Sequence, residues 1–286
     1  MAILETKNLT YTYGAGTPFE KTAVENVNLS VEKGAFVGVI GHTGSGKSTF
    51  IQHLNALLTV QSGTLTVGDI DLSKGKKTDK KLLKVLRSKV GMVFQYPEYQ
   101  LFAETVFEDV AFGYKNFNPQ ADENLVKTAV YDALTRVGLD YSIAKKSPFE
   151  LSGGQKRRVA IAGVIVTSPE VLVLDEPVAG LDPIGKRELM RLLHELHSTA
   201  CKTVIIVSHD MDEVCENCTR VAVFSQGEVI AEGTPEEVFS QGEKMRGLRL
   251  GVPLTEYLTE RLAEKGVNLN CDLTENDFIR AVKELC

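Results

Sequence analysis

One glycine-rich segment constrains the fold of this chain more than any other feature. It lies between an apolar run, Val37 to Ile40, and residues 48–58, whose apolar spacing predicts a helix. Glycines let backbone N–H groups turn inward around phosphate oxygens, and the start of a helix adds the positive end of its dipole. A strand–loop–helix context is what a phosphate-binding loop requires. We therefore predict nucleotide phosphate binding by Gly41, His42, Thr43, Gly44, Ser45, Gly46, Lys47, Ser48 and Thr49.

Two residues of this loop have separate expected roles. Lys47 supplies a positive charge for the β- and γ-phosphates, and the Ser48 hydroxyl can bind Mg²⁺. The alternative, a chance glycine-rich turn, does not explain why a strand precedes the loop and a helix follows it. A phosphate loop alone does not say which class of nucleotide hydrolase this is.

Strand and helix patterns alternate through most of the chain, which predicts a parallel α/β sheet. Val171–Leu174 and Val204–Ser208 are short apolar strands, as expected at the centre of such a sheet. Further strands are expected in residues 2–40, 65–67 and 90–95, and further helices in residues 122–138 and 155–167. From Thr234 the pattern changes: a helix start at Pro235, a loop-like stretch with Gly242, Gly247, Gly251 and Pro253, then helices at about 254–265 and 274–285.

Composition excludes several classes of protein. The net charge of −6 argues against nucleic acid as a partner, since nucleic-acid-binding surfaces are strongly basic. No run approaches the roughly 18 apolar residues of a membrane helix, and the N-terminus lacks a signal-peptide pattern, so a cytoplasmic protein is expected.

Residues 74–89 are crowded with lysine and predict a solvated helix face. The odd number of cysteines in a long chain argues against a disulfide framework, and the Cys215/Cys218 pair is interpreted as structural. The five cysteines are Cys201, Cys215, Cys218, Cys271 and Cys286.

A second motif, residues 151–155, begins another predicted helix. Its sequence, Leu-Ser-Gly-Gly-Gln, resembles the signature of ABC-type ATPases. Physically it is a second anion site, built from the Ser152 hydroxyl, the amides of Gly153 and Gly154 and a helix N-terminus, with Gln155 beside them. The resemblance implies that the signature of one subunit and the phosphate loop of another enclose ATP between them.

The strand Val171–Leu174 ends in two carboxylates, Asp175 and Glu176. Carboxylates at the end of a buried strand are costly unless a cation or a reaction uses them. Asp175 fits the orientation of Mg²⁺ and its waters, and Glu176 fits a general base for attack on the γ-phosphate. The resemblance implies the same roles.

The family resemblance assigns four further positions. Gln95 matches the Q-loop glutamine, which senses the γ-phosphate and contacts Mg²⁺, and His209 matches the switch histidine that holds the attacking water. Asp182 matches the D-loop aspartate that bridges two sites. An aromatic residue near the N-terminus stacks on adenine in this family; Tyr13 is the first choice, with Tyr11 and Phe19 as alternatives.

The resemblance covers residues 2–240 and implies an ABC-type fold. It comprises a RecA-like parallel core sheet, an N-terminal antiparallel β subdomain and a helical signature subdomain at about 96–168. We expect an ATPase domain over 1–240 and a small helical extension over 241–286 that serves dimerisation. Residues 96–106, 155–163 and 235–239 closely resemble the ATPases of energy-coupling-factor transporters.

This narrower resemblance implies a subunit that couples ATP hydrolysis to import of a vitamin or a transition-metal ion such as cobalt. Its expected partners are a paralogous ATPase, a transmembrane coupling protein and a substrate-binding membrane protein, at the cytoplasmic face of the membrane. A homodimer is the alternative to the mixed dimer. An apolar loop at residues 96–106 suits a partner's helix. Other functions left open are a conventional ABC transporter ATPase and a soluble ABC ATPase without a role in transport.

Overall fold

The chain folds into two compact units in a computed structural model. Unit 1 consists of Met1–Phe50, Val60–Lys74 and Val207–Cys286, and unit 2 of Ile51–Thr59 and Gly75–Ile206. The residues that the structure describes are 1–73, 75, 79–240, 242–248, 250–269, 271 and 273–285.

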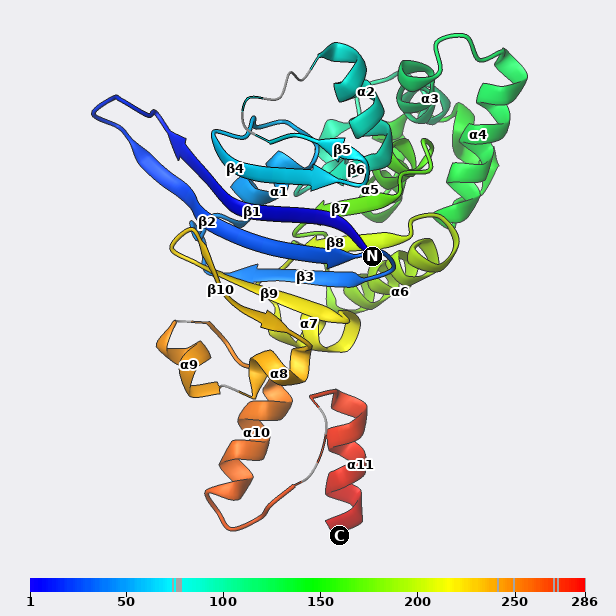
Figure 1. Ribbon diagram of the computed structural model, residues 1–286. Helices are drawn as coiled ribbons and strands as arrows, with labels where there is room; N and C mark the ends of the chain where they lie inside the picture. Colours follow the sequence, from blue (N-terminus) through cyan, green and yellow to red (C-terminus); the bar gives the residue numbers. More distant parts are fainter. Residues whose placement is uncertain are drawn as a thin grey trace. The chain divides into compact units, whose positions relative to one another are not determined.

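Unit 1 contains an antiparallel sheet whose strands lie in the first quarter of the chain (Figure 1). Its strands lie in the order β2-β1-β4-β5, and β1 pairs with both β2 and β4. Apolar side chains at alternating positions of β2 point to the core, which is the pattern expected of a sheet with one covered face. This confirms the predicted N-terminal β region. The strands are β1 (Ala2–Tyr13), β2 (Lys21–Glu32), β4 (Ser62–Val67) and β5 (Ile70–Asp71).

A second group of strands in unit 1 positions the phosphate loop. β3 (Phe36–Gly41) is buried along its whole length and runs parallel to β9 (Arg220–Ser225), which pairs with β10 (Glu228–Gly233). Helix α1 (Lys47–Leu54) starts directly after the loop. It ends earlier than the predicted residue 58, because Ala56 adopts a left-handed backbone with φ of 52° and the Leu57 N–H turns back to the Gln52 carbonyl at 2.9 Å.

Unit 2 contains the strands β8 (Thr203–Val207, of which Val207 belongs to unit 1), β7 (Val171–Asp175) and β6 (Val90–Val93), in that order, and β6 and β7 run parallel. The predicted helices 122–138 and 155–167 correspond to α4 and α5. Helix α3 packs so closely on α5 that a Cβ at Gly113 would lie 2.4 Å from the Gly163 carbonyl oxygen. The helices are α2 (Lys80–Lys89), α3 (Val106–Phe117), α4 (Glu123–Arg136), α5 (Gly153–Ile165) and α6 (Pro183–Thr199), with short 3₁₀ turns at Pro97–Gln100, Tyr141–Lys145 and Pro148–Glu150.

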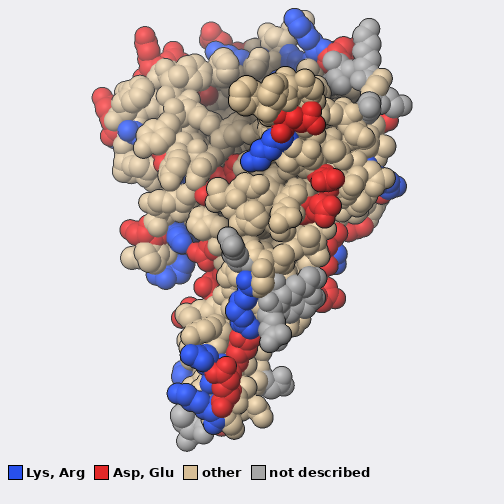
Figure 2. All heavy atoms as spheres, turned by 90° about the vertical axis from the view of Figure 1, so that its left-hand side faces the viewer, with Lys and Arg blue, Asp and Glu red and all other residues tan. Residues whose placement is uncertain are grey.

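After β10 the chain of unit 1 is helical. α8 (Pro235–Phe239) is followed by α9 (Gly242–Gly247), α10 (Leu254–Ala263) and α11 (Glu275–Leu285). Helices α10 and α11 agree with the predicted ranges, whereas the prediction of a loop over 242–253 is wrong at α9. Its residue Met245 is completely buried and its carbonyl accepts the N–H of Leu250 at 3.0 Å, so tertiary packing overrides the two glycines. Acidic and basic side chains are interspersed on this part of the surface (Figure 2).

Several remaining expectations concern cysteines, lysines and membrane helices. Cys215 lies in α7 (Met211–Asn217) and Cys218 at its end; both are buried, and burial raises the pKa of each thiol. Burial also raises the pKa of Cys201 to about 12, while Cys286 lies outside the described residues.

The lysine-rich segment contains α2, with residues 74 and 76–78 outside the description. Within the described ranges, no helix has the length and apolar character needed to cross a membrane.

Candidate nucleotide-binding site

The phosphate loop lines a hollow of about 190 Å³ in unit 1. Its walls are Gly44–Thr49 together with Tyr13, Lys21 and Ala23. The Lys47 side chain is buried in the loop and its ammonium donates to the carbonyls of Gly41 and His42 at 2.7 and 3.0 Å. A buried cation that is held by main-chain oxygens beside an open hollow is placed to attract an anion.

Glycine is required at two positions because the backbone passes very close to other atoms. Gly46 has φ of 105°, and a Cβ there would lie 2.3 Å from the carbonyl oxygen of Ala23. A Cβ on Gly41 would lie 2.3 Å from the Phe224 carbonyl oxygen and 2.6 Å from the Ser45 hydroxyl. The loop therefore packs closely against strands β2 and β9, and a side chain at either glycine would displace it.

Lys21, Ala23 and Gly227 complete this part of the site, and sequence reasoning missed them. The Gly227 N–H donates to the Ser45 carbonyl at 3.0 Å, and the Gly227 carbonyl accepts the N–H of Glu25 at 2.8 Å. These residues belong to no local motif, since they approach the loop only through the pairing of distant strands. No signal in the sequence could have identified them.

Tyr13 is the aromatic residue that lies at the hollow. Its hydroxyl is 3.3 Å from the Thr49 hydroxyl, and its ring packs edge-on against Tyr11 at 4.9 Å between centroids. Tyr13 is 41% exposed and lines the hollow, so part of its side chain is accessible to a bound nucleotide. Phe19 is 88% exposed, and neither it nor Tyr11 lines the hollow. This geometry favours Tyr13 over its two alternatives.

His209 also belongs to unit 1, in the short connection between β8 and α7. The residues on either side of it are tied to α7: the Ser208 hydroxyl donates to Glu213 at 2.6 Å and the Asp210 carboxylate caps the helix at the Glu213 N–H. The exposed imidazole is thus carried on a short, well-anchored turn.

The carboxylates predicted for catalysis lie at the end of β7 in unit 2. The Gln95 side-chain amide donates to the Glu176 carboxylate at 2.8 Å, so two predicted site residues 81 positions apart are in direct contact. Glu176 has φ of 47°, and Tyr96, next to Gln95, has φ of 54°. Non-glycine residues in this left-handed region cost about 1–3 kcal/mol each, and such strain clusters at functional sites.

The signature segment forms a capping box at the start of α5. The Ser152 hydroxyl accepts the Gln155 N–H at 3.3 Å, while the Gln155 side chain accepts the Ser152 N–H at 3.1 Å. A Cβ at Gly153 or Gly154 would have no described atom within 4 Å. The helix N-terminus therefore presents open backbone to its surroundings. Asp182 caps α6 in the same way, accepting the Gly185 N–H at 2.7 Å.

The predicted Mg²⁺ ligands are all oxygen donors, which this hard cation prefers. They are the Ser48 hydroxyl, the Asp175 carboxylate and the Gln95 side-chain oxygen. Ser48 is exposed at the start of α1, and Asp175 is partly exposed at the end of a buried strand. This donor set fits Mg²⁺, which retains water and phosphate ligands and needs few from the protein.

Arg157 is a residue whose role the sequence did not reveal. It lies in α5 directly after the signature and pairs with Glu98 at 2.9 Å. The same guanidinium donates to the carbonyls of Pro177 and Ala179, both at 3.1 Å. One side chain therefore connects the signature helix with the segments that follow Gln95 and Glu176.

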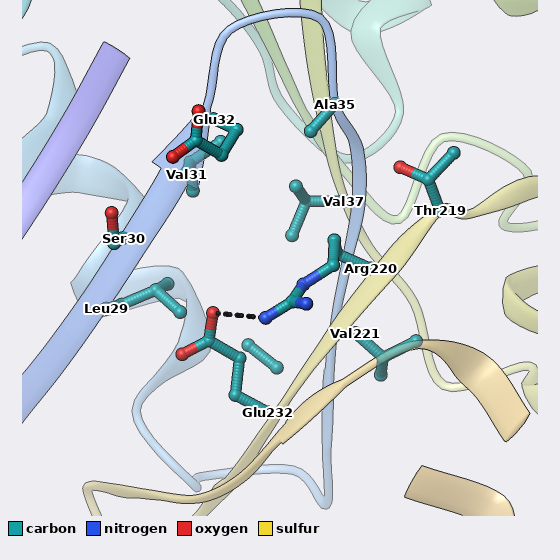
Figure 3. A pocket seen from close by; sticks show the side chains of 11 residues that line it. Leu29, Ser30, Val31, Glu32, Ala35, Val37, Thr219, Arg220, Val221 and Glu232 are labelled. Atoms are coloured by element: carbon teal, nitrogen blue, oxygen red, sulfur yellow. Dashed lines mark hydrogen bonds and ion pairs between the residues drawn. The ribbon is translucent and has the colours of Figure 1, made fainter. Parts of the chain in front are cut away.

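A larger hollow on unit 1 takes no part in this arrangement. It has a volume of about 440 Å³ and lies between β2, β3, β9 and β10 (Figure 3). Its walls are mainly aliphatic, and Arg220 and Glu232 pair at 3.2 Å across it. None of the predicted site residues lines it.

Comparison with protein families agrees with this arrangement. The family model described as ABC transporter matches residues 24–179. A second model, described as an AAA domain, matches residues 143–216 and overlaps the first. The ABC transporter match covers more than half of the chain and includes both the phosphate loop and the signature.

Known relatives narrow the assignment. An energy-coupling factor transporter ATP-binding protein, EcfA2 of Clostridium tetani, is 48% identical over 99% of this chain and 96% of the relative. The solved structure of cbiO1 from Clostridium perfringens, described as part of the ABC transporter complex cbiONQ, has a TM-score of 0.76 and 39% identity, covering 91% of this chain and 99% of that one. A dimeric post-hydrolysis state of the ATP-binding cassette MJ0796, bound to ADP and Pi, has a TM-score of 0.71 and 30% identity, covering 81% and 98%.

Fold, motifs and relatives therefore agree: the chain is an ATPase of the ABC transporter family and belongs, within it, to the ATP-binding proteins of energy-coupling factor transporters.

Proposed function

We propose that this chain hydrolyses Mg-ATP in a dimer, with each nucleotide enclosed by the phosphate loop of one subunit and the signature of the other. The observation that carries the proposal is the open helix N-terminus at Ser152–Gln155. A Cβ at Gly153 or Gly154 would meet no described atom outside their own helix within 4 Å, so the chain leaves space beside this helix start. The γ-phosphate of ATP bound to a second subunit would supply the anion that such a site attracts.

One group of residues would bind and orient the nucleotide and its Mg²⁺ ion. Lys47 and the loop amides would hold the β- and γ-phosphates, and Tyr13 would stack on adenine. Ser48, Asp175 and Gln95 would supply oxygen ligands to Mg²⁺. When bound, Mg²⁺ neutralises charge that develops on the phosphate oxygens.

A second group of residues acts on the attacking water and its proton. Glu176 would accept the proton of the attacking water as its oxygen bonds to the γ-phosphorus and the bond to ADP breaks. Its contact with Gln95 holds the carboxylate in one orientation before the reaction. His209 would hold the water and the γ-phosphate, and Asp182 would connect the two sites of the dimer. Positioned proton transfer contributes about 10²–10⁴-fold in rate.

The segment from Tyr96 to Val106 is the proposed docking site for a helix of the membrane partner. Tyr99 is 84% exposed and Phe102 is 62% exposed, and the Phe102 ring packs edge-on against Phe112 at 5.1 Å. The Asp109 carboxylate accepts the N–H groups of Phe102 and Ala103, at 3.2 and 2.9 Å, which fixes the segment to α3. Exposed aromatic side chains on a fixed backbone suit a partner's apolar helix.

The membrane assembly is inferred from the relatives. We propose a paralogous ATPase as the second subunit, with a homodimer as the alternative. A transmembrane coupling protein and a substrate-binding membrane protein would complete the complex at the cytoplasmic face. Its cargo would be a vitamin or a transition-metal ion.

The helical extension from residue 241 is proposed to assist dimerisation. Leu254, Tyr257 and Ile279 are exposed apolar side chains on α10 and α11. Several of the extension's apolar side chains, with Leu273 and Phe278 among them, line a hollow of about 380 Å³. Apolar surface of this kind is stabilised by burial against a second chain.

Affinity purification of the chain from native membranes, followed by mass spectrometry, tests the assembly. We expect recovery of a second ATPase and a multi-span membrane protein. Tyr99→Ala combined with Phe102→Ala should lose the membrane protein and keep the second ATPase. Tyr141→Ala is the control, since Tyr141 lies in the same unit but outside the docking segment and is about as exposed as Phe102.

Recovery of ribosomal or DNA-associated proteins in place of membrane proteins would overturn the transport assignment. It would leave the ATPase assignment intact, because the nucleotide-binding residues do not depend on the partner.

A further inference from the structure

The lysine-rich segment at residues 74–89 has no role in ATP binding or subunit contact as proposed above. It contains seven lysines and Arg87 but a single acidic residue, Asp79. The segment therefore carries a local charge of +7 in a chain whose net charge is −6. Such a concentration of one sign in an otherwise acidic protein indicates a specific anionic partner.

Helix α2 arranges part of this charge on one face. Lys80, Leu83, Lys84 and Arg87 follow one another at helical spacings of three and four, so they lie along one stripe. With Asn116 and Phe117 at the end of α3, this stripe lines a hollow of about 260 Å³. Helices α2 and α3 lie beside each other in unit 2 (Figure 1).

Arg87 is fixed in place at this hollow. Its Nε and Nη2 atoms donate to the carbonyls of Asn55 and Ala56 at 3.3 and 3.2 Å, beyond the end of α1. Both partners are neutral carbonyl groups, so the guanidinium charge is not cancelled there. The Arg87 side chain is therefore a pre-oriented cation at the edge of the hollow.

Lys80 and Lys84 are exposed. Neither forms an ion pair with any part of the chain that the structure describes. Lys89, by contrast, does not line this hollow and pairs with Glu170 at 4.0 Å. The hollow thus combines three uncompensated positive charges, the Asn116 amide and an aromatic ring.

We propose that the hollow between α2 and the end of α3 binds the phosphate groups of anionic phospholipids. Arg and Lys side chains are the usual ligands of phosphate oxygens, and clusters of basic residues on a helix bind anionic lipid headgroups. The apolar parts of Leu83 and Phe117 suit the boundary between headgroups and acyl chains.

A lipid surface fits these features better than nucleic acid does. The rest of the chain is acidic, so a nucleic-acid strand that followed the protein surface beyond this patch would be repelled, whereas a single headgroup needs only the patch itself. The proposal rests on the proposed function in one respect: a transport subunit works next to a membrane, where such headgroups are concentrated.

Vesicle co-sedimentation of the full chain tests the proposal. The probes are vesicles of equal parts phosphatidylglycerol and phosphatidylcholine, and vesicles of phosphatidylcholine alone. Wild-type protein should bind the anionic vesicles, and binding should weaken with added salt because the Debye length falls from about 10 Å at 0.1 M to about 3 Å at 1 M.

The decisive variant is Lys80→Gln combined with Lys84→Gln. Each basic side chain near an anionic surface contributes about fivefold, so the pair should lower the partition coefficient about 25-fold. The matched control is Lys145→Gln with Lys146→Gln, which removes the same charge from two other exposed lysines of unit 2. The control should bind as wild type does, and both variants should keep wild-type ATP hydrolysis.

Three outcomes would overturn the proposal. One is equal binding of the wild type to neutral and anionic vesicles, and another is equal loss of binding in the two double variants. The third is binding of RNA or inorganic phosphate through Lys80 and Lys84 without any vesicle binding. Failure to hydrolyse ATP would instead count against the proposed function, and the vesicle result does not depend on it.

Discussion

Arg157 and Glu98 form a two-point ion pair in the interior of unit 2. The Arg157 Nε lies 3.0 Å from one Glu98 carboxylate oxygen, and its Nη2 lies 2.9 Å from the other. The Arg157 side chain is only 5% exposed, and two further N–H groups donate to carbonyls of the segment after Glu176. This guanidinium joins the docking segment, the signature helix and the catalytic segment through one side chain.

Arg157→Met should destabilise the protein strongly, because it leaves the Glu98 carboxylate partly buried without its partner. Removal of one member of a buried pair costs about 3–5 kcal/mol. The free energy of unfolding from urea titration measures this loss. Arg191→Met is the control, since Arg191 is exposed and its pair with Glu195 is long, so it should change stability by less than about 1 kcal/mol.

The same pair predicts a pH dependence of stability. Burial acts to raise the pKa of Glu98, but the hydrogen bond and the charge of Arg157 outweigh it and leave the pKa below its ordinary value. The ionised carboxylate therefore stabilises the folded state above the unfolded pKa of about 4.3, and this stabilisation is lost as pH falls through the folded pKa.

Glu98→Gln cannot titrate at this position. The stability difference between wild type and Glu98→Gln should be constant near neutral pH and shrink as pH falls below about 4.3. Urea unfolding across this range is the measurement. A difference that does not change with pH would show that ionised Glu98 is not selectively stabilised in the folded state.

Glu176→Gln should preserve ATP binding and slow turnover by about 10²-fold or more, because an amide cannot accept the proton of the attacking water. Phosphate release under saturating ATP measures turnover, and gel filtration with ATP detects a trapped dimer. Turnover near the wild-type value would remove Glu176 from the assigned role.

Gly46→Ala should abolish tight ATP binding. It combines a strained φ of 105° with a Cβ placed 2.3 Å from the Ala23 carbonyl oxygen, so the loop must move. Gly16→Ala is the matched control: φ is also positive, at 77°, but no described atom lies within 4 Å of its Cβ. Calorimetric titration should give wild-type ATP affinity for Gly16→Ala, and equal losses in the two variants would contradict the steric explanation.

Tyr13→Ala should weaken ATP binding by about 5- to 150-fold, since removal of one base-stacking aromatic costs about 1–3 kcal/mol. Tyr13→Phe keeps the ring and loses only the contact between its hydroxyl and Thr49, so its affinity should stay near that of the wild type. Phe19→Ala tests the alternative. A larger loss in Phe19→Ala than in Tyr13→Ala would assign adenine stacking to Phe19.

Local patterns were sufficient to predict the motif-bearing elements. The start of α5 follows from neighbouring residues, because Ser152 and Gln155 cap each other three positions apart. Helix α4 likewise begins after its own cap, Asp122. The strand β7 is a continuous apolar run, which is typical of a buried parallel strand, and it places Asp175 and Glu176 at its end.

Local patterns failed where distant segments decide the outcome. Helix α9 contains two glycines and looks like a loop, but burial of Met245 stabilises it as a helix. Helix α1 ends four residues early because the backbone turns left-handed at Ala56. Intrinsic propensity is a weak prior that such tertiary contacts override.

The sequence by itself determined the class of chemistry, since the phosphate loop and the signature are short motifs whose residues act through their own backbone and helix ends. Only the tertiary structure decided which distant residues complete them. Ala23 and Gly227 contact the phosphate loop, and Gln95 contacts Glu176, which lies 81 positions further along the sequence. These contacts depend on strand pairing and side-chain packing between segments far apart in the chain, and no local pattern encodes such distances.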